Sequence, residues 1–232
     1  MNRRHFLRGA AAAVSQRWLP AASTADTIDL THCTIHLSSN ATARERKSAL
    51  VLIEEAEKRN NVEWRVQSNP GQGTAIYLGT TGLPNSRFSQ AVAAAKRAGA
   101  EGYAIDTGVN ANGHWIVVAG ADERGLLFGV GKLLRTIIFE KERASADAKL
   151  LHLSTAPKYS LRGHQIGYRP KTNAYDAWDV PMWEQYIREM ALFGTNAIVP
   201  TVNAIGPPNR AAHRNAFNMI GMLRVTPNKY RV

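Results

Sequence analysis

Residues 161–200 read LRGHQIGYRPKTNAYDAWDVPMWEQYIREMALFGTNAIVP, and no other stretch of the chain says more about its architecture. The pattern predicts a strand over 161–168, then a helix, and then a second strand over 196–199. Asp179 suits the N-cap of the helix and Pro181 suits its first turn. Two strands joined by a helix pack side by side in parallel, so the stretch predicts the first βαβ of a larger α/β architecture.

The helix inside this stretch is amphipathic, and it is expected to end at Gly194 because glycine readily takes the left-handed conformation that follows a helix. Its apolar side chains recur at helical spacing, which predicts a single buried face. The side chains expected on that face are Trp183, Tyr186, Ile187, Met190 and Phe193.

Upstream, strand and helix signals alternate along the chain, as in domains that pack helices on a sheet. The first expected elements are a strand over 27–37, a helix over 41–59 with Leu50, Ile53 and Ala56 inward, a strand over 62–66 with Val62, Trp64 and Val66 on one face, and a buried strand over 74–79.

The second half of this region repeats the alternation. Asn112-Gly113 predicts a hairpin turn, because both residue types tolerate positive φ. The expected elements are a helix over 85–99 capped by Asn85 or Ser86, two strands over 102–108 and 114–120, and a helix capped by Asp122 whose apolar stripe comprises Leu126, Leu127, Val130, Leu133, Leu134, Ile137 and Ile138.

These elements predict an α/β fold class. The small domain, residues 27–155, is expected to be an α+β sandwich whose mixed sheet is covered by helices on one side. Residues 140–160 are expected to form a charged linker. The strand–helix–strand unit follows over 160–199, which the resemblance described below implies is an incomplete (β/α)8-barrel start, and residues 200–232 are expected to form an atypical basic tail.

The net charge of +11 is concentrated at the two ends of the chain. Residues 1–20 and 200–232 together hold nine of the 29 lysines and arginines and no acidic residue. The remainder is nearly neutral, with 20 basic residues against 18 acidic ones. A nucleic-acid-binding domain carries its basic excess on the folded body, so nucleic acid is not expected as a partner.

The N-terminal residues 1–25 are similar to a twin-arginine export signal, with Arg3-Arg4 ahead of a small apolar run. A disordered basic N-terminus is the alternative. The signal would place the protein in the periplasm or outside the cell. No run of residues is long and apolar enough to predict a membrane span, and the single Cys33 excludes an internal disulfide framework.

Several chemical motifs can be excluded. Gly125, Gly129 and Gly131-Lys132 lack the spacing of a phosphate-binding loop, and they are expected to let a helix pack closely on its sheet. His32 and His36 lie on one face of the predicted strand, and that face carries no third metal ligand. No nucleophile elbow is present. Neither a cofactor nor a metal is therefore expected.

The small-domain pattern resembles the N-terminal domain of glycoside hydrolases, notably the family 20 β-hexosaminidases and the family 67 α-glucuronidases. In those families the domain precedes a (β/α)8 barrel whose first strand carries an Arg-Gly pair. The residues that carry the resemblance are Gly102-Tyr103, Ile116, Ala121-Asp122, Arg124-Gly125-Leu126 and Arg162-Gly163.

The resemblance implies a carbohydrate substrate and a set of residues that bind it. Arg162 is implied as a sugar contact, with a structural ion pair at the domain junction as the alternative. Arg169, Tyr168 and Trp178 follow the first barrel strand, on the side where barrel active sites lie. Trp178 either stacks on a sugar ring or packs over the barrel rim.

No catalytic residue is assigned, because the acids of these families lie on the middle strands of the barrel. Asp176 and Asp179 lie three residues apart, and Asp179 is expected to cap a helix. We therefore expect the N-terminal portion of an exported glycoside hydrolase, truncated or frame-shifted near residue 200 and inactive by itself. The alternative is a non-catalytic α/β module that binds carbohydrate or protein. The sequence leaves the oligomeric state open.

Overall fold

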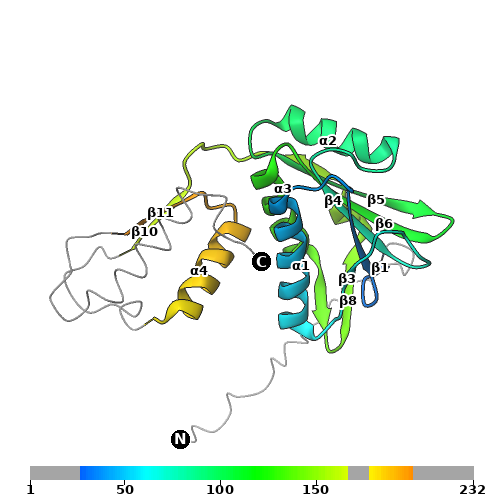
Figure 1. The fold of residues 1–232 in the computed structure, drawn as a ribbon, viewed down its shortest axis with the longest axis horizontal. Coiled ribbons are helices and arrows are strands. Elements are labelled where there is room, and N and C mark those ends of the chain that lie inside the picture. The colour runs from blue at the N-terminus through cyan, green and yellow to red at the C-terminus, as the bar shows by residue number, and fades with distance from the viewer. Residues whose placement is uncertain (1–26, 167–177, 201–232) are drawn as a thin grey trace, which may run out of the picture.

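The computed structural model describes residues 27–166 and 178–200 (Figure 1). The described chain forms a small α/β domain and a β10–α4–β11 unit beside it. Within the described ranges, no helix has the length and apolar character needed to cross a membrane. The elements are β1 (Thr27–Asp29), β2 (Thr34–Leu37), α1 (Ala43–Asn60), β3 (Arg65–Val66), β4 (Ala75–Gly79), α2 (Ser86–Ala98), β5 (Tyr103–Asn110), β6 (Gly113–Gly120), α3 (Glu123–Thr136), β7 (Ile138–Glu140), β8 (Arg143–Asp147), the 3-10 turn η2 (Ala148–Leu151), β9 (Leu153–Thr155), β10 (Gly163–Ile166), α4 (Val180–Leu192) and β11 (Ala197–Pro200).

The main sheet of the small domain is mixed, which confirms the predicted fold class. Its strand order is β3-β2-β4-β6-β5-β9. The strands from β3 to β6 run parallel, and β5 is antiparallel to both of its neighbours. The predicted hairpin joins β5 to β6, and Gly113 has φ of 130° there, a conformation that glycine adopts without strain.

Helices cover both faces of this sheet, so the prediction of helices on one side is wrong. α1 and α3 lie on one face and α2 lies on the other (Figure 1). The alternation along β4 and β6 shows this, because Ile76 and Ile116 pack under α1 and α3 while Tyr77 and Trp115 pack under α2. All five residues of β4 are buried, as expected for a strand covered on both faces.

The structure confirms the predicted caps of α2, α3 and α4, and it adds a cap of α1 that the sequence analysis did not single out. Thr42 caps α1 in a reciprocal capping box with Glu45, and Asn85 caps α2. The Asp122 side chain caps α3 and the Asp179 side chain caps α4. These side chains accept hydrogen bonds from first-turn amides that would otherwise have no partner.

Two segments fold differently from their predictions. Residues 27–37 do not form one strand: β1 and β2 are separated by a turn in which the Thr31 amide donates to the Asp29 carboxylate, at 2.8 Å. Residues 140–155 are not a linker. β8 lies between β1 and β7 in a second, three-stranded sheet, and β9 adds to the edge of the main sheet.

Several side chains that were predicted to lie on the buried face of a helix or strand do not lie there. Leu50 is 37% exposed, whereas Leu52 and Ala56 of α1 are fully buried. Helix α3 ends at Thr136, so Ile137 and Ile138 lie beyond the helix and are not part of its apolar face. In β3, Val66 is 53% exposed although Val62 and Trp64 before it are buried. Phe193 is 70% exposed, whereas Trp183 of the same predicted face is buried.

The β10–α4–β11 unit has the predicted architecture. β10 and β11 pair in parallel, with Gly163 opposite Ala197 and His164 opposite Ile198. α4 connects them, with Asp179 at its N-cap and Pro181 in its first turn. Gly194 follows the helix with φ of 91°, as expected for a glycine after a C-terminus.

His36 is expected to make the stability of the small domain sensitive to acid. Its ring is buried, stacks on Tyr77 at 5.0 Å and bonds Thr34 Oγ1 through Nε2 at 2.8 Å. Burial lowers the pKa of His36 from its ordinary value of 6.5. The unfolded chain therefore binds more protons below pH 6.5, so stability from neutral His36 is complete above that pH and is lost as the pH falls toward the folded pKa.

We expect the melting temperature of the wild-type protein to fall more between pH 8 and pH 5 than that of His36→Phe, which keeps the ring and removes the titration. Circular dichroism melts at both pH values measure the difference. An equal fall in both proteins would contradict this account of His36.

Candidate functional site at the domain junction

The junction between the small domain and β10 is built on the turn that joins α2 to β5. The Gly102 amide donates to the Gly99 carbonyl at 3.0 Å, and Glu101 in between has φ of 56°. The Glu101 amide donates to Asp122 Oδ2 at 2.8 Å. Only 8% of Glu101 is exposed, so the turn presents a nearly buried carboxylate to the junction.

Asp122 and Gly125 explain why α3 begins against this turn. One oxygen of Asp122 holds the Glu101 amide, and the other accepts from the Gly125 amide at 2.8 Å, which caps α3. A Cβ on Gly125 would lie 2.1 Å from the Gly102 carbonyl oxygen. Only glycine therefore permits this approach, and the motif residues 121–126 lock the turn that carries Glu101.

Arg162 is the partner of this carboxylate. Its Nη2 donates to Glu101 Oε2, its Nε to the Gly194 carbonyl at 2.7 Å and its Nη1 to the Tyr159 carbonyl at 2.5 Å. The guanidinium also lies over the Phe128 ring, 5.3 Å from its centroid. With its side chain 20% exposed, Arg162 has its donors directed at the protein.

Two further groups complete the site. Arg124 Nη1 lies 2.8 Å from Glu101 Oε1. Asn196 Nδ2 lies 3.3 Å from both oxygens of Glu101 and 2.7 Å from the Ser160 carbonyl, and its Oδ1 accepts from the Arg162 amide at 2.9 Å. The carboxylate is thus surrounded by two guanidiniums and an amide. Such an arrangement joins separate segments of the chain and leaves no carboxylate oxygen free to act as a catalytic base.

The structure shows the ion pair that was the alternative interpretation of Arg162. The residue precedes β10, and its carbonyl accepts from the Asn196 and Ala197 amides at the start of β11. It therefore lies at the N-terminal ends of these strands, whereas barrel active sites lie at the C-terminal ends. Contact between Arg162 and sugar stays a prediction, and it requires that substrate replace bonds already made to protein.

Trp178 lies just before α4, in an aromatic cluster with Trp183 and Tyr186. The Trp178 ring is 5.1 Å from Trp183 and 5.2 Å from Tyr186, and the Tyr186 hydroxyl contacts His164 Nδ1. Trp178 is half-buried and Trp183 is buried. The cluster thus packs α4 on its strands and leaves part of the Trp178 ring accessible.

The four predicted site residues are not brought together by the described chain. Arg162 bonds the Gly194 carbonyl beyond the C-terminus of α4, whereas Trp178 precedes its N-terminus. The 13 residues of α4 span about 20 Å, so the two side chains cannot contact one sugar ring. Arg169 and Tyr168 lie outside the described residues, as does Asp176.

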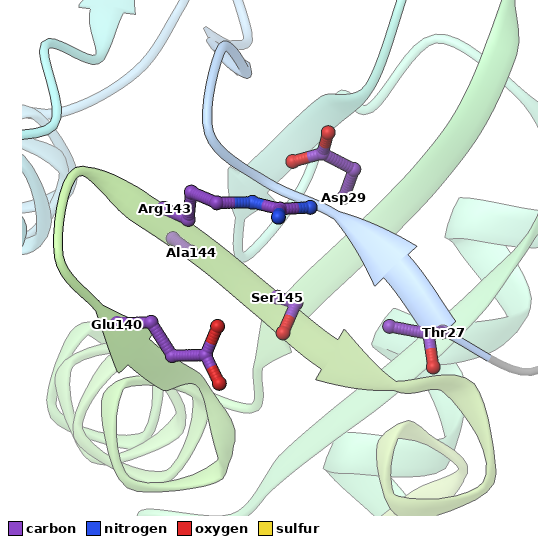
Figure 2. Close-up of a pocket in the computed structure, with 6 residues that line it drawn as sticks. All are labelled: Thr27, Asp29, Glu140, Arg143, Ala144 and Ser145. Carbon is purple, nitrogen blue, oxygen red and sulfur yellow. The ribbon is translucent and has the colours of Figure 1, made fainter. Parts of the chain in front are cut away.

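A separate concavity lies on the outer face of the three-stranded sheet (Figure 2). Its volume is about 310 Å³, and Figure 2 shows the Arg143 guanidinium extending toward Asp29. Hydrogen bonds from Thr31, together with the nearby Arg143 charge, lower the pKa of Asp29. The lining is largely exposed and polar, and it comprises Thr27, Asp29, Glu140, Arg143, Ala144 and Ser145.

Other chemistries find no support in the described ranges. No three histidines, cysteines, aspartates or glutamates lie close enough there to hold a metal ion.

Gly129 lets α3 approach β6, because a Cβ would lie 2.7 Å from Val118 Cγ1. Gly131 faces α4 instead, where its Cβ would lie 2.0 Å from the Leu192 carbonyl oxygen. The predicted close packing on the sheet is thus confirmed for Gly129, whereas Gly125 lies against the turn before β5 and Gly131 lies against α4.

The sequence did not reveal Glu101 or Asn196 as junction residues. Glu101 lies 61 residues from Arg162, and it sits in a positive-φ turn that non-glycine residues rarely occupy. The available signal was its position directly before the Gly102-Tyr103 pair of the family pattern. Asn196 likewise directly precedes a strand, where its side chain can bond the neighbouring strand.

Comparisons with known proteins agree with this fold. Residues 35–133 match the family model for the glycosyl hydrolase family 67 N-terminus. No curated protein matches the chain in sequence.

Three solved structures share the fold at low identity. The GH20 β-N-acetylhexosaminidase from Streptomyces coelicolor A3(2) is 16% identical, with a TM-score of 0.51 over 75% of this chain and 31% of that one. A family GH115 4-O-methyl-α-glucuronidase is 16% identical, with a TM-score of 0.50 over 82% and 28%. The GH20 exo-β-N-acetylglucosaminidase from Vibrio harveyi is 12% identical, with a TM-score of 0.50 over 76% and 23%.

The chain thus spans between about a quarter and a third of the length of these enzymes. At such identities the structural likeness concerns the fold. Together with the family model, it confirms the resemblance that the motif residues predicted: the small domain is similar to the N-terminal domain of glycoside hydrolases, and its residues 35–133 match the family 67 version.

Proposed function

We propose that this chain is the N-terminal portion of a glycoside hydrolase that acts on carbohydrate of the hexosaminide or glucuronide class. The observation that carries the proposal is the order of its two parts. A domain that matches the family 67 N-terminus is followed directly by a parallel βαβ unit, which is the unit from which a (β/α)8 barrel is built.

The proposal assigns the motif residues and the substrate-binding residues to different places. Asp122, Arg124 and Gly125 hold the turn that contacts the start of the proposed first barrel strand. Substrate contacts are assigned to the opposite ends of the strands, where Trp178 offers an aromatic face for a sugar ring. Tyr168 and Arg169 are proposed to join it there.

The chain by itself is proposed to lack hydrolase activity. By resemblance, the catalytic acids of these families belong to the middle strands of the barrel. Asp179 is occupied in capping α4, where its carboxylate accepts from the Met182 amide at 2.9 Å. A glycosidase needs a carboxylic acid pair flanking the scissile bond, or one carboxyl with help from the substrate.

The experiment combines turnover and binding on the 232-residue protein. We expect no release of 4-nitrophenol from aryl α-glucuronide or aryl β-N-acetylglucosaminide. We expect glucuronic acid, N-acetylglucosamine or their oligosaccharides to shift the indole NMR signal of Trp178, with weak affinity. Trp178→Ala should abolish the sugar-induced shifts of neighbouring residues. Tyr159→Ala, which removes another accessible aromatic ring, should preserve the sugar-induced shifts.

Each outcome separates the candidate functions. Turnover of either aryl glycoside would show that the chain holds its own catalytic groups and would contradict the proposed inactivity. Absence of any shift at Trp178 at saturating sugar would contradict the carbohydrate role and favour a protein-binding module.

Export is proposed from Arg3-Arg4 and the apolar run that follows. Mass spectrometry of the protein from a periplasmic fraction should find a processed N-terminus near Asp26. Replacing both arginines with lysine should leave the protein in the cytoplasm. An unprocessed cytoplasmic wild-type protein would contradict export.

A further inference from the structure

The β10–α4–β11 unit has little core of its own. Within the described ranges, its separate cluster has one buried member, Trp183, with Trp178, Tyr186 and Ile198 packed around it. Its sheet has two strands in the part of the chain that the structure describes. Two strands and one helix bury too little apolar surface to remain folded alone in water, so the order of the unit must come from what it rests on.

The C-terminus of α4 is anchored in the small domain. Leu192 is 3% exposed and belongs to the main hydrophobic core. Its carbonyl accepts from Arg135 Nη1 at 2.5 Å. The absent side chain of Gly131 leaves the space that this carbonyl occupies, since a Cβ would lie 2.0 Å from it.

The middle of α4 is held by charge. Arg188 Nη1 lies 2.6 Å from a Glu54 carboxylate oxygen and 3.7 Å from one of Glu55, both on α1. The Arg188 side chain is 29% exposed and that of Glu55 is 3% exposed. Solvent therefore screens these pairs less than it screens fully exposed ones.

The strand end of the unit is held by Glu101 through Arg162 and Asn196. Among the residues that the structure describes, Leu192 is the one member of this unit that belongs to the main hydrophobic core, and arginine contacts lie on either side of it. Polar contacts of this kind align surfaces accurately but contribute less to stability than a continuous apolar seam of equal area.

We propose that the small domain is a docking template for the β10–α4–β11 unit, and that Glu101 and Gly131 are its two positioning residues. The unit orders only when docked, and it opens as one body while the small domain stays folded. This step rests on the proposed function, in which β10 is the first barrel strand: the template aligns that strand for the strands that pair with it. This inference does not depend on which carbohydrate is bound, or on whether any is.

Hydrogen exchange of the full chain, followed by mass spectrometry, tests the proposal. Glu101→Gln leaves Arg162 without a carboxylate partner in a nearly buried site. Gly131→Ala raises the helix propensity of α3 but forces a methyl group into the Leu192 carbonyl. In both variants we expect exchange in α4 to rise about tenfold or more, with exchange in β4 and β6 unchanged within about twofold.

Two matched variants serve as controls. Glu63→Gln breaks an ion pair with Arg65 whose side chains are 74% and 76% exposed, and Gly71→Ala adds a methyl group into open space. Neither should alter exchange in α4. An equal rise in α4, β4 and β6 in the two test variants would overturn the proposal, because the chain would then unfold as one unit. Unchanged exchange in α4 would also overturn it.

Discussion

Replacing Gly125 with alanine is expected to destabilise the small domain by about 3 kcal/mol, because the new Cβ would lie 2.1 Å from a backbone oxygen, that of Gly102. The clash involves backbone on both sides, so no side-chain rotation relieves it. To accommodate the methyl group, α3 must move away from the turn that carries Glu101. Urea unfolding followed by circular dichroism at 222 nm measures the loss.

Gly71→Ala is the control for this prediction, since nothing lies within 4 Å of its Cβ position. Its unfolding midpoint should stay close to that of the wild type. If Gly125→Ala unfolds at the same urea concentration as the control, the close approach of α3 to Gly102 does not exist in solution.

Leu52→Ala is expected to cost 2–5 kcal/mol, whereas Leu50→Ala, two residues away on α1, should cost less than about 1 kcal/mol. Leu52 is fully buried in the main core, and Leu50 is 37% exposed. The two substitutions remove the same atoms, so their difference reports burial alone. Urea unfolding of both variants measures this difference. Equal losses of unfolding free energy would mean that the face of α1 described here is not the one that packs against the sheet.

The buried face of α1 could not be derived from apolar spacing, because polar residues occupy several of its buried positions. Glu45 is buried since it completes the capping box with Thr42 and accepts from the Thr80 amide at 2.7 Å. Glu55 is buried beside Arg59 and Arg188. The capping box and the Glu55–Arg59 spacing are local, but the contacts to Thr80 and Arg188 are long-range, so the sequence pattern does not show that these carboxylates are buried.

Local signals predicted the elements better than their arrangement. Caps at Asn85, Asp122 and Asp179, and the turn at Asn112-Gly113, act through neighbouring residues and were recognisable. The placement of α2 depends on which face of the sheet remains uncovered, which is a long-range property. The uniformly apolar run of β4 was nevertheless a signal that both faces are covered.

The candidate site shows the same limit. The sequence identified Arg162 and the motif residues around Asp122, but it did not show that they meet. Their contact depends on Glu101, which reaches Arg162 across 61 residues of chain. The direction of β10 then places Arg162 at the N-terminal end of the strands, where barrel residues contribute to stability.

This placement changes what the family motif means in physical terms. Asp122 joins the Glu101 turn to α3, Gly125 allows the close approach, and Arg124 shares the carboxylate with Arg162. The motif thus presents one oriented carboxylate to the residue that precedes β10, the strand proposed above as the first of a barrel. Carbohydrate chemistry is proposed for the opposite ends of the strands.

A double-mutant cycle between Glu101 and Arg162 measures whether the Glu101 carboxylate holds β10 against the small domain. Glu101→Gln, Arg162→Met and the double variant are compared by the free energy of opening of α4, measured by hydrogen exchange. We expect a coupling of about 2 kcal/mol, since the side chains of Glu101 and Arg162 are only 11% and 20% exposed. Additive effects, within about 0.5 kcal/mol, would show that the carboxylate does not hold the strand and would contradict the account.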